Sequence, residues 1–370
     1  MNVRLPLARP DDWNSWRWQL REAVTTVDGL AQALRLTESE RIGATRAVRA
    51  GFPLRITPYY LSLVDRDDPT CAIRRQVVPL RAESEATAGD LRDPLGEEAH
   101  EVAPGLVQRY PDRALLVTTD QCAIYCRFCT RSRVVGQGAG PTPLSRFEEA
   151  FRYLEAHDEV RDVILSGGDI FAMATRRIVE LVARLRQIDH IDTLRIATRV
   201  PVALPQRITD ELLQALRPFH PLWVMTHFNH PKELTEASRA ALHRLADAGF
   251  PVMNQAVLLR GINDDEVVLA ELFRGLVKCR TRPYYLLQMD PVQGTGHLRT
   301  PLARGIEIMD RLQGRLSGIA LPKFIVDTPG GMGKVPVGPD FITRRAPGRT
   351  SLRTHRGVTV DYIDPPERAD

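Results

Sequence analysis

The sequence predicts an α/β fold in which parallel strands alternate with helices, in a sheet that is either open or closed as a (β/α) barrel of the TIM type. Between residues 112 and 330, short apolar runs alternate with helical patterns, and distinctive polar residues directly follow most of the runs. Repeated strand–helix units build a parallel sheet, and active sites of such barrels lie at the carboxyl ends of the strands. We expect a helical N-terminal extension (1–100), the barrel (101–330) and a short C-terminal segment (331–370).

Seven apolar runs are predicted to form the strands, because each is short and bounded by turn or helix signals. The runs are Ala114–Thr119, Asp162–Ser166, Thr193–Thr198, Leu222–Thr226, Val252–Leu259, Tyr284–Met289 and Lys323–Val326. Distinctive residues follow most of them. In chain order these are Asp120 and Cys122, Gly167-Gly168-Asp169, Arg199, His227, Asp290 and Asp327. Since the carboxyl ends of parallel strands meet at one edge, we expect these residues to share one site.

Three helices between the strands have recognisable ends. One is predicted to begin at Ser145 with Glu148 three residues on, which is a capping box. A second spans 235–248 and stops at a glycine, the usual residue after a helix. The third is predicted to begin at Asn263, with Glu266 at the reciprocal capping position and its apolar residues on one face. These helices fit the alternation expected of the barrel.

The N-terminal extension is predicted to be helical and charged, with loops between its helices. Trp13 and Trp16 are three residues apart and would share one helix face. We expect them to anchor the extension on the main body or on a partner subunit. The segment 82–100 is polar and rich in turn residues, and is predicted to be a surface connection.

Composition narrows the functional classes. Lys and Arg number 50 against 46 Asp and Glu, giving a net charge of +4. The basic residues are scattered without interleaved aromatic residues, so no nucleic-acid partner is expected. No run approaches the roughly 20 apolar residues that cross a bilayer, and the start of the chain has no apolar signal segment. The sequence therefore predicts a cytoplasmic protein with no membrane partner.

Three of the five cysteines lie close together in the motif Cys122-Ala-Ile-Tyr-Cys126-Arg-Phe-Cys129. Clustered cysteines in such a chain indicate metal or redox chemistry rather than disulfides. Three thiolates on one loop can bind three irons of a 4Fe-4S cluster and leave the fourth open to a small molecule, whereas fully protein-ligated clusters use four. The alternative is a zinc site, but zinc ribbons need a second ligand pair, and Cys71 and Cys279 stand alone.

A CxxxCxxC motif after the first strand of a (β/α) barrel resembles the signature of the radical S-adenosylmethionine (SAM) superfamily, which implies a partial radical SAM barrel. The resemblance also implies that SAM binds the open iron. Phe128, before the last cysteine, is similar to the aromatic residue of that superfamily. Gly167-Gly168-Asp169 resembles its glycine motif, which contacts the methionine end of SAM.

A glycine-rich loop, Asp327-Thr-Pro-Gly-Gly-Met-Gly-Lys334-Val-Pro, follows the last predicted strand. Glycines let the backbone approach a ligand or adopt positive φ. A phosphate-binding P-loop is excluded, because Val335 follows the lysine and Pro336 would disrupt the helix start that such a loop needs. A lysine in this setting can form a Schiff base with pyridoxal phosphate (PLP), and a solvated surface lysine is the alternative.

Together these motifs resemble the lysine 2,3-aminomutase family, radical SAM enzymes that also use PLP. The resemblance runs from Trp13 to about residue 340. It includes Tyr110-Pro-Asp-Arg113, Cys122–Arg131, Leu165–Asp169, Leu204–Thr209, Thr226–Pro231, Asn254-Gln255, Leu258–Gly261, Pro283–Tyr285, Asp290, Gly294–His297 and the glycine-rich loop. It implies an isomerase that moves the α-amino group of L-lysine to the β-carbon and gives β-lysine.

The resemblance implies a role for each matching residue. The cluster ligands would be Cys122, Cys126 and Cys129, and Lys334 would carry PLP. The other cofactor contacts would be Arg109 and Arg113 for the PLP phosphate, and Gly167, Gly168, Asp169, His227 and Gln255 for SAM. Arg131 is expected to clamp the substrate carboxylate, and Asp290 and Asp327 would bind the side-chain ammonium. Two carboxylates facing one ammonium suit a cationic amino acid and not glutamate.

Some residues depart from the family pattern. Leu287 stands where lysine enzymes carry a tyrosine near PLP, which leaves the cofactor packing open. Asp265 replaces a ligand of an intersubunit zinc, and no cysteine follows Cys279, so no structural zinc is expected. The resemblance further implies a small-molecule amino acid substrate, a homo-oligomer and an external one-electron donor of the flavodoxin or ferredoxin type.

Other functions stay open at this point. Arginine or ornithine could be the substrate of the same reaction, because the side chain of each also carries a positive charge. A related enzyme acts on a lysine within a protein, such as a translation elongation factor, but such relatives are generally shorter and lack the tryptophan-bearing N-terminal region. An iron–sulfur protein that binds RNA belongs to another class and would need a basic, aromatic-bearing accessory domain.

Overall fold

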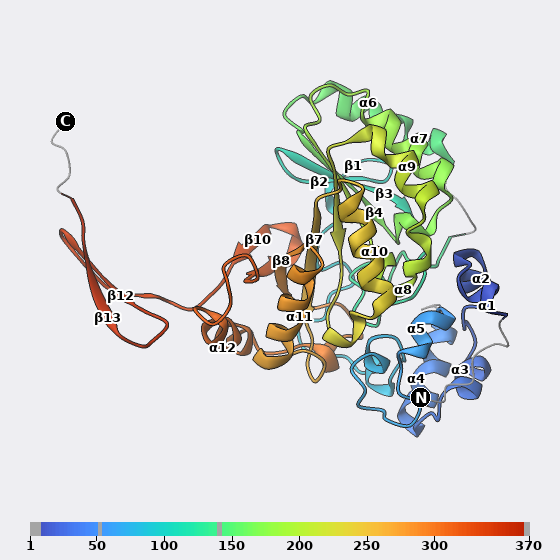
Figure 1. The fold of residues 1–370 in the computed structure, drawn as a ribbon, viewed down its shortest axis with the longest axis horizontal. Coiled ribbons are helices and arrows are strands. Elements are labelled where there is room, and N and C mark those ends of the chain that lie inside the picture. The colour runs from blue at the N-terminus through green and yellow to red at the C-terminus, as the bar shows by residue number, and fades with distance from the viewer. Residues whose placement is uncertain (1–8, 51–53, 139–142, 366–370) are drawn as a thin grey trace.

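A mostly parallel sheet forms the centre of the computed structural model, which describes residues 9–50, 54–138 and 143–365 (Figure 1). The strands lie in the sheet in chain order. They are β1 (Glu101–Ala103), β2 (Leu106–Tyr110), β3 (Arg113–Thr119), β4 (Asp162–Gly167), β5 (Thr193–Ala197), β6 (Leu222–Thr226), β7 (Val252–Leu258), β8 (Thr281–Gln288), β9 (Lys323–Thr328) and β10 (Gly333–Pro336). Neighbours from β3 to β9 pair in parallel, whereas β1, β2 and β10 are antiparallel additions. Among the described residues no ladder joins β1 to β10, and the arrangement is the predicted α/β partial barrel.

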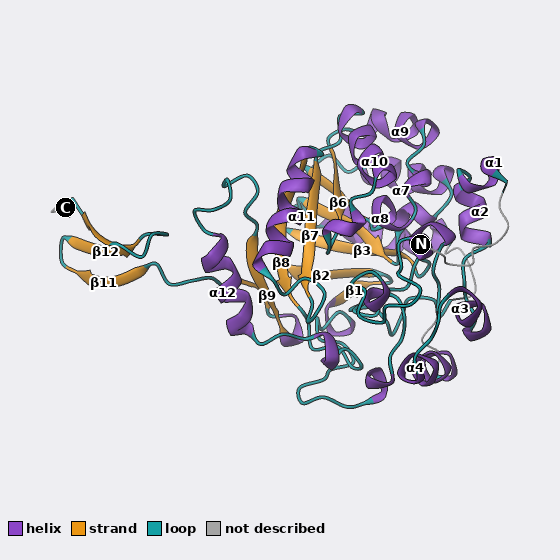
Figure 2. Cartoon of the chain, turned by 60° about the horizontal axis from the view of Figure 1, so that its bottom comes forward, coloured by secondary structure: helices purple, strands orange, loops and turns teal. Residues whose placement is uncertain are grey.

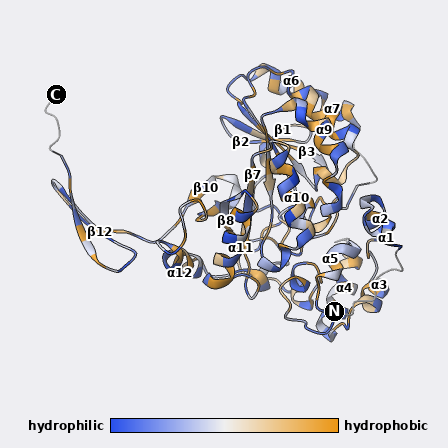
Figure 3. Ribbon diagram, viewed as in Figure 1, coloured by the Kyte–Doolittle hydropathy of each residue, from blue (hydrophilic) through white to orange (hydrophobic). Residues whose placement is uncertain are grey.

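Helices connect the parallel strands and cover the outside of the sheet (Figure 2). They are α6 (Glu148–Ala156), α7 (Thr175–Leu185), α8 (Val200–Ala203), α9 (Asp210–Leu216), α10 (Glu236–Asp247), α11 (Glu266–Lys278) and α12 (Leu302–Leu312). In α11 the predicted apolar face, with Leu269 and Leu276, is buried. Figure 3 shows hydrophobic and hydrophilic residues alternating along α10 and α11, as expected of helices with one face on a core.

All the predicted strands are present, with small differences at their ends. The helix α10 is also as predicted: the Thr235 side chain caps its start, and Gly249 follows its end with a φ of +89°. The capping box at Ser145 is absent, which corrects that prediction. Residues 144–147 form a 3-10 turn instead, and α6 begins only at Glu148.

The start of α11 also differs from the prediction. The Asp265 carboxylate accepts hydrogen bonds from the N–H groups of Val267 (2.8 Å) and Val268 (3.1 Å), so Asp265 caps the helix. Asn263 is buried before the helix, where its side chain accepts from the N–H of Leu259 (2.7 Å). An aspartate next to the first turn satisfies the free N–H groups directly, which is why it replaces the predicted cap.

The N-terminal extension is helical, as predicted. Its helices are α1 (Pro10–Trp13), α2 (Trp16–Arg21), α3 (Val27–Ala33), α4 (Glu38–Arg49) and α5 (Pro58–Ser62). Trp13 and Trp16 lie on different helices, so the predicted shared face is wrong; the Ser15 side chain caps α2 between them. Trp16 nevertheless anchors the extension, because the buried guanidinium of Arg207 lies 4.6 Å from its ring centroid.

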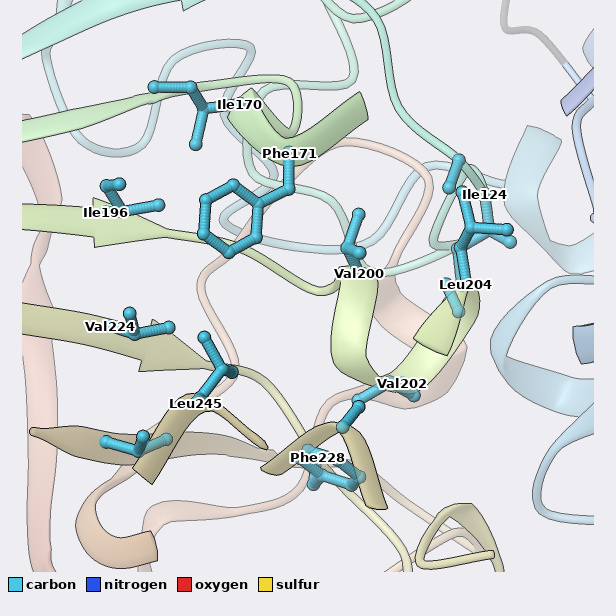
Figure 4. Packing of buried hydrophobic residues seen from close by; sticks show 14 of the residues in the cluster. Ile124, Ile170, Phe171, Ile196, Val200, Val202, Leu204, Val224, Phe228 and Leu245 are labelled. Atoms are coloured by element: carbon cyan, nitrogen blue, oxygen red, sulfur yellow. The ribbon is translucent and has the colours of Figure 1, made fainter. Parts of the chain in front are cut away.

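The loop that carries the three cysteines packs into the same core as the ends of the strands. Figure 4 shows its residue Ile124 in one cluster with Val200 and Leu204, which follow β5. Phe171, after β4, and Phe228, after β6, belong to this cluster as well. Shared packing therefore fixes the cysteine loop relative to the carboxyl ends of these strands.

The chain continues past the main sheet into an arm that projects away from the rest of the molecule (Figure 1). It is a small antiparallel sheet of β11 (Ile342–Ala346), β12 (Arg349–Arg353) and β13 (Thr359–Ile363). Lys334 itself lies in β10 and so belongs to the main sheet. No helix within the described ranges has both the length and the apolar character needed to span a bilayer.

Candidate active site

A cavity of about 440 Å³ is lined by residues at the ends of the parallel strands and by side chains from within the sheet. Every residue to which the family resemblance assigns a role lies on its wall. These residues are Arg109, Arg113, Cys122, Cys126, Cys129, Arg131, Gly167, Gly168, Asp169, His227, Gln255, Asp290, Asp327 and Lys334. Asp120, which was also expected at the site from its place after a strand, does not line the cavity. The fold thus brings together residues that are far apart in the sequence, as their positions after the strands led us to expect.

The cysteine loop is held from outside by the N-terminal part of the chain. The N–H of Tyr125 donates to the carbonyl of Arg55 (3.0 Å), and the N–H of Arg127 donates to the carbonyl of Gln76 (2.9 Å). The buried guanidinium of Arg127 pairs with Glu83. Because these partners precede the loop by tens of residues, the extension and the segment after it position the three thiols.

The chemistry of the thiols suits a multi-iron cluster. Burial raises the pKa of Cys122 and raises that of Cys129 to about 11, and the neighbouring thiols add to both effects. Such thiols lose their protons when they bind metal. Within the described residues no three His, Cys, Asp or Glu side chains converge on a point where one ion could sit. The thiols of a 4Fe-4S cluster each bind a different iron and need not converge.

Gly167 and Gly168 let the end of β4 run against the start of the cysteine loop. Gly167 has a φ of +116°, which favours glycine, and the N–H of Gly168 donates to the carbonyl of Thr119 (2.5 Å). A Cβ at Gly167 would clash with the Thr119 carbonyl, and one at Gly168 with that of Gln121. The glycine pair is therefore required for this packing, whether or not it also contacts a cofactor.

The Asp169 carboxylate joins the ends of β4 and β5. It accepts hydrogen bonds from the Thr198 hydroxyl (2.6 Å) and from the N–H groups of Arg199 (2.6 Å) and Phe171 (3.1 Å). Burial raises the pKa of Asp169, and these hydrogen bonds oppose the rise. Its carboxylate has partners within the protein, so a contact with SAM stays a prediction.

His227, which follows β6, lies near the cysteine loop, with its ring centroid 5.4 Å from that of Phe128. Burial, and then the positive charge of Arg199, lower the pKa of His227 to about 3, so the imidazole is neutral. Its Nε2 is buried and has no hydrogen-bond partner within the described residues. An unpaired buried nitrogen on a cavity wall fits a polar ligand atom. The predicted contact of His227 with SAM would use this nitrogen. Gln255, the other residue predicted to contact SAM, lines the same cavity.

Lys334, Arg109, Tyr110 and Asp327 form a second group of residues on the cavity wall, which we call its lysine end. The Lys334 ammonium pairs with Asp327, and the Arg109 guanidinium donates to the same carboxylate at 3.3 and 3.4 Å. The N–H of Lys334 donates to the Tyr110 hydroxyl (2.7 Å), and the Arg113 guanidinium lies 4.1 Å from the Tyr110 ring centroid. The Lys334 amine, together with the two guanidiniums near Tyr110, gives the cavity a basic wall that fits the aldehyde and phosphate of PLP.

Asp290, which follows β8, supplies a second carboxylate beside Asp327. Burial, and then the negative charge of Asp327, raise the pKa of Asp290 to about 7, although Lys334 and Arg109 oppose the rise. The two carboxylates thus repel each other in a desolvated site. A further positive group between them would relieve that repulsion.

The segment 82–100 contributes to the site, which corrects the prediction that it is only a surface connection. Leu95 lines the cavity. Glu97 is buried, and its carboxylate accepts from the Arg131 guanidinium at 2.6 and 2.9 Å. Arg131 also donates to the Ser166 hydroxyl (3.0 Å). The residue predicted to clamp the substrate carboxylate is therefore oriented by partners of its own.

Sequence reasoning missed two carboxylates near the cysteines, Glu97 and Glu233, and the contact that a third charged residue, Arg199, makes with a cysteine. Arg199 was noted only as a strand-end residue, yet its guanidinium donates to the Cys126 sulfur (2.6 Å) and to Glu233 (2.8 Å). Glu97 and Glu233 carried no signal, because a lone glutamate in a polar segment is usually solvated. Tyr110 lay in a motif that was noticed, but its hydrogen bond to Lys334 could not be foreseen.

Comparisons with known proteins identify the family. A profile described as Lysine-2,3-aminomutase matches residues 309–370, and one described as Radical SAM superfamily matches residues 116–273. The L-lysine 2,3-aminomutase of Clostridium subterminale is 47% identical over 96% of this chain and 85% of that protein. That of Acetoanaerobium sticklandii is 46% identical over 96% of this chain and 86% of that protein.

A relative with another name is also similar. The glutamate 2,3-aminomutase of Clostridioides difficile is 40% identical over 96% of this chain and 84% of that protein. The overall likeness therefore establishes the reaction class more firmly than the substrate. The cysteine loop, the strand-end residues and the lysine line one cavity, and the profiles and relatives agree with that arrangement. This chain therefore belongs to the lysine 2,3-aminomutase family of radical SAM enzymes and is an aminomutase, that is, an isomerase.

Proposed function

We propose that this protein converts L-lysine into β-lysine by moving the α-amino group to the β-carbon, with a 4Fe-4S cluster, SAM and PLP. Membership of the radical SAM superfamily implies the cluster and SAM. Lys334 and the guanidiniums of Arg109 and Arg113 support PLP. When bound, the cluster and SAM would supply a radical that removes a hydrogen from the substrate, and PLP would carry the migrating amino group.

The observation that carries lysine as the substrate is the pair of carboxylates, Asp290 and Asp327, on the cavity wall. Lys334 and Arg109 pair with Asp327. Asp290 forms no ion pair within the described residues, and it lies buried beside the charge of Asp327. The two buried carboxylates would therefore favour a further cation, which the ammonium of a substrate lysine supplies.

The same pair argues against the substrate of the glutamate-named relative. A glutamate side chain would bring a third negative charge to Asp290 and Asp327, and like charges in a desolvated site repel strongly. Arginine and ornithine also carry a cation, so the charges alone do not distinguish them from lysine. Their different lengths make them suitable arms of the same experiment.

The protein's own part in the reaction is to bind and orient. Arg131, oriented by Glu97 and Ser166, would grip the α-carboxylate through its fork of N–H groups. Asp290 and Asp327 would hold the other end of the substrate. Fixing both ends sets the β-carbon at one place in a walled cavity, which favours a single site of reaction and keeps bulk water away.

The proposal includes a low-potential one-electron donor of the flavodoxin or ferredoxin type, a homo-oligomer and a cytoplasmic location. It includes no structural zinc. These points follow from the family resemblance and from the composition of the chain, and not from the charged residues that line the cavity.

The test is an anaerobic assay. The cluster is reconstituted, PLP, SAM, a reductant and isotopically labelled lysine are added, and the products are followed by NMR. We expect labelled β-lysine. Parallel arms contain labelled arginine, ornithine or glutamate, and a further arm contains a lysine-bearing protein such as an elongation factor.

The outcomes separate the parts of the proposal. Unchanged lysine together with continued SAM cleavage and turnover of another substrate would overturn lysine and keep the radical chemistry. Turnover of lysine without PLP would overturn the role of Lys334. Retention on RNA at moderate salt without any turnover would favour the RNA-binding class instead.

A further inference from the structure

A buried charge network contacts the sulfur of Cys126. The Arg199 guanidinium donates through one amino group to the Cys126 sulfur (2.6 Å). Through the other it donates to the Glu233 carboxylate (2.8 Å) and the Gln76 carbonyl oxygen (2.6 Å). Its centre also lies 5.0 Å from the Phe128 ring centroid. One buried cation thus joins a cluster cysteine to a carboxylate.

The carboxylate of this network is completely satisfied. Glu233 is fully buried, and one oxygen accepts from the Tyr60 hydroxyl (2.9 Å) as well as from Arg199. The other oxygen accepts from the N–H groups of Asn229 (2.6 Å) and His230 (2.9 Å). With four donors on two oxygens, Glu233 has a fixed position. It therefore fixes the guanidinium, which in turn has a fixed position at the sulfur.

Hydrogen bonds and charges at the sulfur ligands are among the features that set the reduction potential of an iron–sulfur cluster. Adding one electron to a 4Fe-4S cluster increases the negative charge on its thiolates. A cation that donates to a thiolate stabilises this reduced form, and a nearby carboxylate destabilises it. The network contains both, held at different distances from the sulfur.

We propose that Arg199 is a positioning residue that raises the reduction potential of the cluster through its hydrogen bond to Cys126, and that Glu233 limits this rise while it holds Arg199 in place. This inference rests on the proposed function, in which Cys126 binds the cluster. The step concerned is the transfer of one electron from a low-potential donor to the oxidised cluster. No proton moves, and Arg199 remains a cation throughout.

The test measures the midpoint potential of the reconstituted cluster by an EPR-monitored redox titration, with dithionite as reductant. Arg199→Met removes the donor, and we expect the ratio of reduced to oxidised cluster at a fixed potential to fall roughly tenfold, which is about 59 mV for one electron. Glu233→Gln removes the opposing charge and keeps an oxygen acceptor. We expect the ratio to shift in the opposite direction.

A double variant keeps the inference testable if Arg199→Met alone does not fold. Arg199→Met alone leaves the Glu233 charge buried without a cation, which destabilises a protein strongly. The double variant Arg199→Met and Glu233→Gln leaves no unpaired charge. Since Arg199 is the group that touches the sulfur, we expect a lower potential than in the wild type, with a smaller shift than in Arg199→Met.

A second buried pair is the matched control. In the N-terminal extension the Arg74 guanidinium donates to Glu40 at 2.6 and 2.7 Å, and both side chains are fully buried. Arg74→Met with Glu40→Gln removes the same two charges at a place outside the cavity wall. Because Gln76, which contacts Arg127 and Arg199, lies two residues after Arg74, we expect the control to lower the melting temperature and to shift the potential by much less than Arg199→Met does.

Equal potentials in the wild type and in both Arg199 variants, or shifts of the same sign in Arg199→Met and Glu233→Gln, would overturn the inference. A shift in the control as large as in the network variants would do so too. A wild-type protein that binds no cluster at Cys122, Cys126 and Cys129 would overturn the proposed function, which distinguishes that failure from a failure of the inference.

Discussion

The cysteine end and the lysine end of the cavity hold their charges in different ways. At the cysteine end Glu233 has four donors, and the loop is hydrogen-bonded to Arg55 and Gln76. At the lysine end Lys334 and Arg109 share one carboxylate, and Asp290 has a raised pKa. The Glu233 carboxylate at the first end thus has a complete set of donors, whereas the carboxylates at the second end have partners that can be exchanged. A site that holds a cluster in place needs charges with fixed partners, and a site that admits a substrate needs charges whose partners can be exchanged.

Removing a thiol at the cysteine end should have the largest effect. We expect Cys126→Ala to lose the cluster and with it all detectable SAM cleavage, because three thiolates are the minimum set here. The PLP absorbance should remain, since Lys334 belongs to the lysine end. Iron analysis, EPR and absorbance spectra check this. Cys279→Ala, a buried cysteine outside the cavity, should keep the cluster; if it loses the cluster as well, the loop is not the binding site.

Removing the amine at the lysine end should give the complementary result. We expect Lys334→Ala to lose the PLP absorbance and to lower turnover of lysine by roughly a thousandfold or more, the scale found when a covalent catalytic group is deleted. The EPR signal of the cluster should be retained. Normal turnover in this variant would contradict the assignment, and loss of the cluster would show that the two ends are not independent.

Asp290 tests the exchangeable charges more finely. We expect Asp290→Asn to raise KM for lysine about 30-fold, equivalent to roughly 2 kcal/mol for one charged partner, with a smaller change in kcat. Since the pKa of Asp290 is raised to about 7, its carboxyl is protonated at lower pH and cannot bind the ammonium. In the wild type kcat/KM should therefore fall below pH 7, and the variant should lack this limb. A pH profile with the same limb in both proteins would exclude Asp290 as its source.

The raised pKa of Asp290 also affects stability. The folded state binds this proton more tightly than the unfolded chain, so the favourable contribution is present at low pH. It is lost as the pH rises from the ordinary range of an aspartate through about 7. Asp290→Asn should remove this loss, which denaturant unfolding of the ligand-free protein at pH 5 and pH 8 can measure.

The smallest effect is expected at Glu97, whose negative charge helps to raise the pKa of both Cys129 and Asp290. Burial by itself would raise the pKa of Glu97. The guanidiniums of Arg131 and then Arg133 outweigh that effect, so the pKa of Glu97 is lowered. Glu97→Gln should reduce the free energy of unfolding by about 1.5–3 kcal/mol, the value of hydrogen bonds to a charged group, and raise KM for lysine by a few-fold. Glu98→Gln, whose side chain is 61% exposed, should change stability by less than about 0.5 kcal/mol. Equal effects would show that Glu97 does not orient Arg131.

The sequence allowed the sheet and the membership of the site to be predicted, but not the partners of each side chain. The strands were recognisable because buried parallel strands are continuous apolar runs, and the residues after them meet by geometry alone. The partners of Arg131 and Arg199 depend on tertiary packing: Glu97 and Glu233 come from segments that look solvated in one dimension. The helix start at Asn263 was wrong because Asp265 competes as the capping residue and only the fold selects between them. The start at Ser145 was wrong because residues 144–147 form a 3-10 turn, and α6 begins after it without a side-chain cap.

The bracing of the cysteine loop has a consequence for biosynthesis. Arg55, Gln76 and Glu83, which bind the cysteine loop, leave the ribosome before the cysteines. Arg199 and Glu233 leave it long afterwards. Nascent chains fold from the N-terminal side as they emerge. The pocket around Cys126 therefore cannot be complete until Glu233 has been made, and iron delivered earlier would meet thiols that lack their cationic neighbour.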